Sequence, residues 1–186
     1  NSLEYIGEKT FYCFTKLETV TIPDNSKLKY VYTSAFEKCT SLKSINLPKG
    51  LESIYSRAFI SCSNLTNLTL PSTLKRIDEL AFSDGPRFKN NELTVPKGVT
   101  TITSRSFDNI KDLKTINVEN GVTTIEKYAF ADNDSLTRVN LPSSITSVAN
   151  TACKYYNEEK YSTCDIYIDK YKGSIPIDKY KGSIPC

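Results

Sequence analysis

Phenylalanine recurs along this chain at an almost constant interval, and this periodicity constrains the fold more than any other feature of the sequence. Six anchors are separated by 25, 23, 23, 25 and 23 residues, and a cysteine follows after another 23. Self-similarity at a period of about 20 to 50 residues indicates a solenoid or a related repeat array. These anchors therefore predict about seven consecutive units, or coils, within the 186-residue chain. Coils 1 to 7 are numbered by their anchors, which are Phe11, Phe36, Phe59, Phe82, Phe107, Phe130 and Cys153.

Each coil repeats the frame LxxIxxxAFxxCxxLxxIxLP, which is most complete between Leu51 and Pro71. Its last segment, LxxIxL, alternates apolar and polar positions, as a β-strand with one buried face does. Proline follows most of these segments and cannot donate a ladder hydrogen bond, so we expect the strands to end there. The stretch before the anchor is too short for an independent helix. It predicts a second, brief extended piece and then one helical or 3₁₀ turn that carries the phenylalanine inward.

A single coil cannot bury its own apolar side, so we expect equivalent strands to stack about 4.8 Å apart in a parallel sheet. The predicted fold class is an α/β solenoid. It spans residues 1–168 in about seven coils, and the last coil is an irregular cap from about residue 145. Residues 169–186 form a C-terminal tail with a tandem nonapeptide, IDKYKGSIP, whose copies are residues 168–176 and 177–185. The tandem indicates either a duplicated ligand motif or a recent duplication.

The chain contains no histidine, which excludes Ser-His-Asp and Cys-His nucleophile systems and every metal site that uses imidazole. A formal net charge of +3 provides no strong field to attract nucleic acid. No run of about 18 apolar residues predicts membrane insertion in this fragment. We therefore expect a non-enzymatic protein without catalytic residues, metal or cofactors. An enzyme with a cysteine nucleophile is the alternative, although no usual general base accompanies any cysteine.

The 23-residue frame resembles the BspA-like, or Treponema-type, leucine-rich repeats of surface proteins. The commoner leucine-rich repeat places Asn or Cys after the strand, whereas here proline follows the strand and cysteine precedes it by three residues. The resemblance covers Leu3 to about Ile168. It implies a right-handed leucine-rich-repeat superhelix whose parallel LxxIxL sheet lines the concave face, with short strands or 3₁₀ and helical turns on the convex side.

The resemblance also implies a cell-surface or secreted protein that mediates recognition or adhesion through the solenoid face. The implied partner is a protein or a glycan, such as host extracellular matrix or a cell surface. An alternative function is a structural or self-assembly module of a larger surface protein, because end coils have unpaired strand edges on which another chain can stack. The oligomeric state stays open.

Polar side chains between the apolar strand positions are expected to form two parallel rows on the concave face. They indicate either a broad hydrogen-bonding face for a partner or a solvated sheet whose threonines and asparagines merely suit strands. Binding hot spots favour Tyr and Arg, so Arg138 and Tyr167 are the expected anchors. The outer row comprises Thr19, Ser44, Asn67, Glu92, Thr115, Arg138 and Asp165. The inner row comprises Thr21, Asn46, Thr69, Thr94, Asn117, Asn140 and Tyr167.

Cysteines occur in two settings. Cys39 and Cys62 occupy the same frame position in adjacent coils, which favours two small buried thiols over a redox or metal pair, because the frame supplies no further ligands. The other setting is the irregular C-terminal end, where one disulfide could secure a cap without the sequence fixing the pair. The candidate disulfide cysteines are Cys153, Cys164 and Cys186.

Among coils 1 to 6, coil 4 departs most from the frame. Gly85 replaces the cysteine, and the stretch from residue 83 to residue 91 is two residues longer than its equivalent in coil 3. The sequence predicts that this segment, with Arg87 and Phe88, bulges outward from the solenoid.

Overall fold

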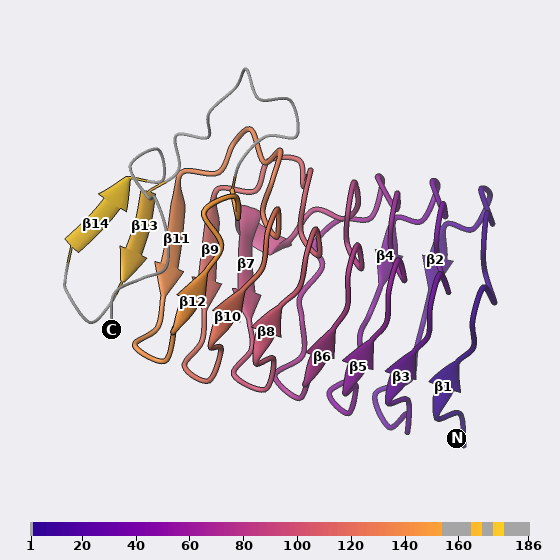
Figure 1. Cartoon of the computed structure of the whole chain (residues 1–186). Coiled ribbons are helices and arrows are strands. Elements are labelled where there is room, and N and C mark those ends of the chain that lie inside the picture. The colour runs from indigo at the N-terminus through magenta and orange to yellow at the C-terminus, as the bar shows by residue number, and fades with distance from the viewer. Residues whose placement is uncertain (1, 154–164, 169–172, 177–186) are drawn as a thin grey trace.

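In the computed structural model, the chain forms an elongated stack of coils with two rows of short strands along its length (Figure 1). The structure describes residues 2–153, 165–168 and 173–176. The LxxIxL row contains β2 (Thr19–Val20), β4 (Ser44–Ile45), β7 (Glu92–Val95), β9 (Thr115–Val118), β11 (Arg138–Leu141) and β13 (Asp165–Ile168). The short-strand row contains β1 (Tyr5–Ile6), β3 (Tyr30–Val31), β5 (Ser53–Ile54), β6 (Arg76–Ile77), β8 (Thr101–Ile102), β10 (Thr124–Ile125) and β12 (Ser147–Val148).

Strands of neighbouring coils pair in parallel, but each row divides into two sheets. These are β2–β4 and β7–β9–β11–β13 on the LxxIxL row, and β1–β3–β5–β6 and β8–β10–β12 on the short-strand row. On the LxxIxL row, Thr94 of β7 pairs with Asn117 of β9, which pairs with Asn140 of β11. The predicted parallel solenoid with a second extended piece in each coil is therefore confirmed. β14 (Gly173–Pro176), from the stretch predicted as a tail, pairs antiparallel with β13. The predicted domain boundaries stay a prediction.

The six phenylalanine anchors stack in single file through the centre of the solenoid. Successive ring centroids lie 5.0, 5.2, 5.5, 5.5 and 6.4 Å apart. Every anchor from Phe36 to Phe130 is fully buried, whereas Phe11 in the first coil is half-buried. Burial of such a side chain stabilises the fold by about 1.5–3 kcal/mol, and only a neighbouring coil can provide it.

The α/β assignment and the helical turns are wrong. The helical content of the described residues is one 3₁₀ segment, η1 (Lys89–Asn91). In coils 1 to 6, the residues two before and two after the anchor have positive φ, between 47° and 60°. These left-handed residues are Lys9, Cys13, Ser34, Lys38, Arg57, Ser61, Leu80, Asp84, Arg105, Asn109, Tyr128 and Asp132.

Hydrogen bonding between coils explains why the turn is not helical. In coil 2, the N–H groups of Ser34, Phe36 and Lys38 donate to carbonyls of coil 3 at 2.8 to 3.0 Å. An α-helix would satisfy these donors within its own coil. Alternating positive and negative φ instead turns every second N–H toward the next coil, so the stack provides the acceptors.

The longer segment of coil 4 does not simply bulge outward. Phe88 is only 4% exposed. Its ring meets Phe82 edge-on at 5.9 Å and Phe107 at 6.1 Å. The Phe88 side chain therefore belongs to the core. The expectation that the whole longer segment bulges outward is wrong at this residue, because burial of the apolar ring draws the segment inward. Gly85 is required close by, because a Cβ there would lie 2.6 Å from the carbonyl oxygen of Phe82.

Candidate functional site

The outer and inner rows lie on the surface of the LxxIxL row, as strand alternation predicts. On β7, Glu92 and Thr94 are exposed, whereas Leu93 and Val95 are buried. Each row residue from coil 1 to coil 6 is exposed or half-exposed. The side chains of Asp165 and Tyr167 lie outside the described residues. A binding role for these rows stays a prediction.

Several inner-row amides already join one coil to the next. The amide oxygen of Asn46 accepts the N–H of Ile22 at 2.8 Å, and Asn140 Nδ2 donates to Asn117 Oδ1 at 2.6 Å. Asparagines of this row therefore stabilise the stack itself. Thr69 and Thr94, in contrast, make no side-chain hydrogen bond with another described residue, so their hydroxyl groups can serve a ligand.

A groove of about 270 Å³ lies on the LxxIxL row between coil 3 and β7. It brings together three residues of the predicted rows, Thr69, Glu92 and Thr94. Lys89 and Asn90, which the sequence did not single out, line the same groove from η1. The groove thus combines small hydroxyls with an exposed ammonium group and an exposed carboxylate.

A cluster of tyrosines on the short-strand row is a surface that the sequence analysis missed. Tyr32 stacks on Tyr55 with centroids 4.8 Å apart, and Tyr5 meets Tyr32 edge-on at 5.7 Å. The guanidinium of Arg76 lies over the Tyr55 ring at 4.7 Å. Tyr30 completes the cluster. These residues flank the buried Ile or Val of the short strands, so the alternation applied to the LxxIxL row would have located them.

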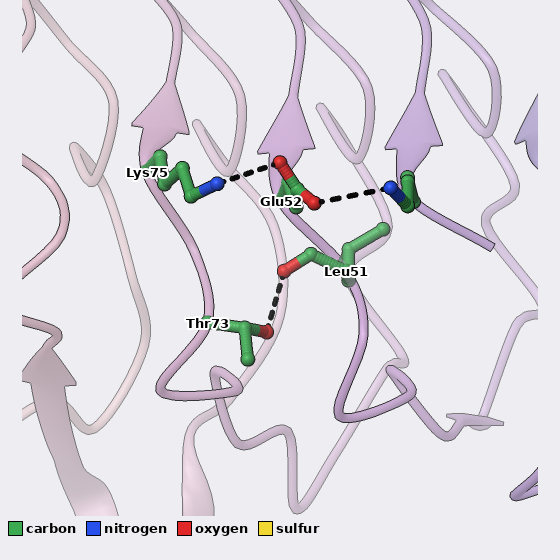
Figure 2. Close-up of polar contacts among 5 residues, drawn as sticks. Leu51, Glu52, Thr73 and Lys75 are labelled. Carbon is green, nitrogen blue, oxygen red and sulfur yellow. Dashed lines mark hydrogen bonds and ion pairs between the residues drawn. The ribbon is translucent and has the colours of Figure 1, made fainter. Parts of the chain in front are cut away.

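Charged residues form a ladder beside this tyrosine cluster. Glu52 lies between Lys75, at 2.8 Å, and Lys29, at 3.5 Å (Figure 2). A hydrogen bond from Lys75 lowers the pKa of Glu52. Thr73 Oγ1 also donates to the carbonyl of Leu51 at 2.7 Å (Figure 2). Exposed ion pairs contribute little stability, so this ladder mainly aligns neighbouring coils.

The core cysteines behave as structural thiols. Cys39 Sγ donates to the carbonyl of Phe11 at 3.0 Å, and Cys62 Sγ donates to that of Phe36 at 3.1 Å. In coil 6, Asn133 occupies the same frame position and donates to Phe107 at 2.9 Å. Burial raises the pKa of the Cys62 thiol, which disfavours the reactive thiolate.

The C-terminal cysteines are described only in part. Cys153 is buried at the end of the described core. Cys164 and Cys186 lie outside the described residues, so a disulfide among the three stays a prediction.

In the described part of the chain, no group of three or more Cys, Asp or Glu residues is placed to hold a metal ion. Across residues 2–153, 165–168 and 173–176, no helix is long and apolar enough to cross a membrane.

Asp108 is a buried carboxylate next to the anchor of coil 5. It is 7% exposed, and its Oδ1 has no hydrogen-bond partner. Burial raises the pKa of Asp108 from 3.8 to about 6, and a hydrogen bond from Ser83 opposes this only partly. The folded protein therefore binds this proton more tightly than the unfolded chain, so stability falls as the pH rises from about 4 to about 6.

Asp108→Asn is expected to remove this pH dependence and to raise the free energy of unfolding at pH 7 by about 2–3 kcal/mol. Urea unfolding followed by circular dichroism between pH 4 and pH 7 measures both effects. Asp112→Asn, at an exposed position, is the matched control and should change stability by less than about 0.5 kcal/mol. If the free energy of unfolding of Asp108→Asn depended on pH as that of the unaltered protein does, Asp108 would not be the source of this pH dependence.

Comparison with known proteins identifies the repeat. The family model of the BspA type leucine rich repeat region matches residues 1–89 and 86–168 in six copies. No curated protein sequence matches the chain. A leucine-rich repeat protein from Bacteroides ovatus ATCC 8483, known from a crystal structure, superposes with a TM-score of 0.55 at 19% identity. The match covers 89% of this chain but 59% of that one.

A second solved structure is less similar. It is a leucine rich cell surface protein from Faecalibacterium prausnitzii A2-165, with a TM-score of 0.30 and 18% identity. That match covers 90% of this chain and 77% of the other. The likeness to the Bacteroides structure supports the solenoid fold, and the family model covers nearly the whole described chain. The chain thus belongs to the BspA-type leucine-rich-repeat family and forms a repeat scaffold suited to binding proteins.

Proposed function

We propose that this chain is a non-enzymatic recognition module of a cell-surface or secreted protein. It binds a protein or glycan partner, such as host extracellular matrix or a cell surface, through the LxxIxL face. One observation carries the proposal. On β7, β9 and β11, the side chains of Thr94, Asn117 and Asn140 follow one another in register on the surface of a parallel sheet. Binding then uses many modest contacts spread over adjacent coils.

The chemistry of the described residues favours recognition over catalysis. The Cys39 and Cys62 thiols are buried and donate to backbone carbonyls, so neither is placed as a nucleophile. The raised pKa of Asp108 belongs to a carboxylate inside the core, away from the groove residues. Family membership adds the expectation of surface display and of an adhesive role.

The test combines partner discovery with paired substitutions. Binding partners are selected from a displayed protein library and a glycan array, and affinity is measured by interferometry. Thr94→Arg with Asn117→Arg is expected to weaken binding at least tenfold, because bulk and charge then obstruct the face. Thr101→Arg with Thr124→Arg, on adjacent strands of the short-strand row, is the matched control and should bind as the unaltered protein does. If Thr101→Arg with Thr124→Arg weakens binding and Thr94→Arg with Asn117→Arg does not, the binding site lies on the short-strand row, which carries the tyrosine cluster.

Self-assembly is a second candidate function, favoured by the exposed first coil. Leu3, Tyr5 and Phe14 are 53%, 57% and 51% exposed there, and β1 is an edge strand. Large apolar side chains at a free strand edge favour association. Light scattering distinguishes the candidates, because assembly predicts particle growth with protein concentration in the absence of any partner.

A further inference from the structure

The longer segment of coil 4 changes the hydrogen-bond ladder of the LxxIxL row. Leu68 of coil 3 forms a parallel bridge with Phe88. The Leu68 N–H donates to the carbonyl of Arg87 at 3.2 Å, and its carbonyl accepts the N–H of Lys89 at 3.1 Å. The segment around Phe88 therefore occupies the hydrogen bonds through which coil 3 would otherwise pair with the strand of coil 4.

β7 is consequently the edge strand of its sheet, since it pairs with β9 and with no other strand among the described residues. The carbonyls of Asn91 and Val95 face β9, where they accept N–H groups at 2.9 and 3.0 Å. Backbone groups of alternate residues point to opposite edges of a strand, so the N–H and C=O of Thr94 face coil 3. No backbone hydrogen bond between described residues joins Thr94 to coil 3.

The groove of about 270 Å³ lies along this free edge. Thr69 and Leu70 line it from coil 3, and Thr94 lines it from β7. The threonine side chains are small, so they leave the backbone accessible. Phe88 contributes to the lining but is only 4% exposed, and it therefore offers no open ring face on which a sugar could stack. This chemistry fits a peptide backbone better than a glycan.

We propose that the groove binds an extended peptide segment of a partner protein, which adds as a strand to the free edge of β7. This inference rests on the proposed function and specifies how the LxxIxL face engages its partner. Because β7 has four residues, a segment of about four to five residues spans the edge. Lys89 and Glu92 line the groove and make no ion pair with another described residue. An acidic side chain in the segment can therefore pair with Lys89, and a basic one with Glu92.

The probe is a fluorescein-labelled heptapeptide with the sequence of residues 136–142, LTRVNLP, because this sequence already pairs in parallel with β9. Anisotropy measures its affinity for the full chain. Thr94→Pro removes the N–H that faces the groove but no bond to β9, so it should weaken binding at least tenfold and leave the fold intact. Thr94→Ser keeps both the backbone N–H and the hydroxyl group, so it is the matched control and its affinity should stay within twofold. Circular dichroism checks the fold of each variant.

A second arm does not depend on the folding of Thr94→Pro. The same heptapeptide with methylated backbone nitrogens cannot donate ladder hydrogen bonds, so it should bind at least tenfold more weakly. Equal affinity of the methylated and unmethylated peptides, equal affinity of a folded Thr94→Pro, or no binding to the unaltered chain at millimolar peptide would overturn the inference. A partner that loses affinity on Thr94→Arg with Asn117→Arg but not on Thr94→Pro would retain the proposed function and reject strand addition.

Discussion

Phe82→Ala is expected to lower the free energy of unfolding by about 3–5 kcal/mol, which is the usual cost of deleting a buried aromatic side chain. Phe82 is fully buried, and its ring stacks at 5.5 Å on both Phe59 and Phe107. The edge-on contact with Phe88 is lost as well. Because each coil is stabilised only by its neighbours, we also expect the unfolding transition to broaden as the two halves of the solenoid uncouple.

Urea unfolding followed by circular dichroism measures both effects of Phe82→Ala, through the midpoint and the slope of the transition. Phe11→Ala is the matched control, because Phe11 is half-buried and stacks on one neighbouring anchor only. Its cost should be less than half that of Phe82→Ala, with an unchanged slope. Equal costs for the two variants would show that stability is not transmitted from coil to coil through the stacked rings.

Gly98→Ala is expected to destabilise the fold by about 3 kcal/mol, because the solenoid leaves no room for one additional carbon at this position. A Cβ on Gly98 would lie 2.3 Å from the carbonyl oxygen of Leu74 in the preceding coil. That oxygen belongs to the backbone and cannot rotate away. The coils that carry β6 and β8 must therefore separate locally.

Gly50→Ala provides a close control for this substitution. Gly50 occupies the same Pro-Lys-Gly context as Gly98, but its added Cβ would meet the carbonyl of Leu28 at 3.8 Å, an ordinary contact. We expect no loss, or a gain of up to about 1 kcal/mol from the reduced entropy of the unfolded chain. Thermal unfolding of both variants checks the contrast. Equal melting temperatures would contradict the packing seen at Gly98.

The repeat alone predicted the parallel rows and the file of anchors, since strand alternation and the spacing of Phe36 and Phe59 depend on residue types that the sequence displays directly. The turn around each anchor could not be predicted in this way. Arg57 and Ser61 adopt positive φ although neither is glycine, because their coil gains hydrogen bonds to the next one. Such a gain depends on a neighbour that single-coil propensities do not include.

The candidate site was predictable in part. Alternation placed Thr69 and Thr94 on the surface, but the groove between them depends on the path of the longer coil 4 segment. The apolar character of Phe88 was the available signal that this segment returns to the core. Tyr32 and Tyr55 were missed for a different reason, because they flank the buried position of the short strands, whereas both predicted rows belong to the LxxIxL strands.

The left-handed turn residues give the solenoid a chemical direction. In the backbone hydrogen bonds between neighbouring anchor turns, the N–H belongs to the N-terminal coil and the carbonyl to the C-terminal one. At the first coil, the carbonyls of Glu8, Thr10 and Tyr12 consequently accept no backbone N–H from the described residues. These carbonyls of the first coil can therefore accept hydrogen bonds from amide hydrogens. A coil or a partner that stacks on this face would continue the ladder by supplying N–H groups in the same register.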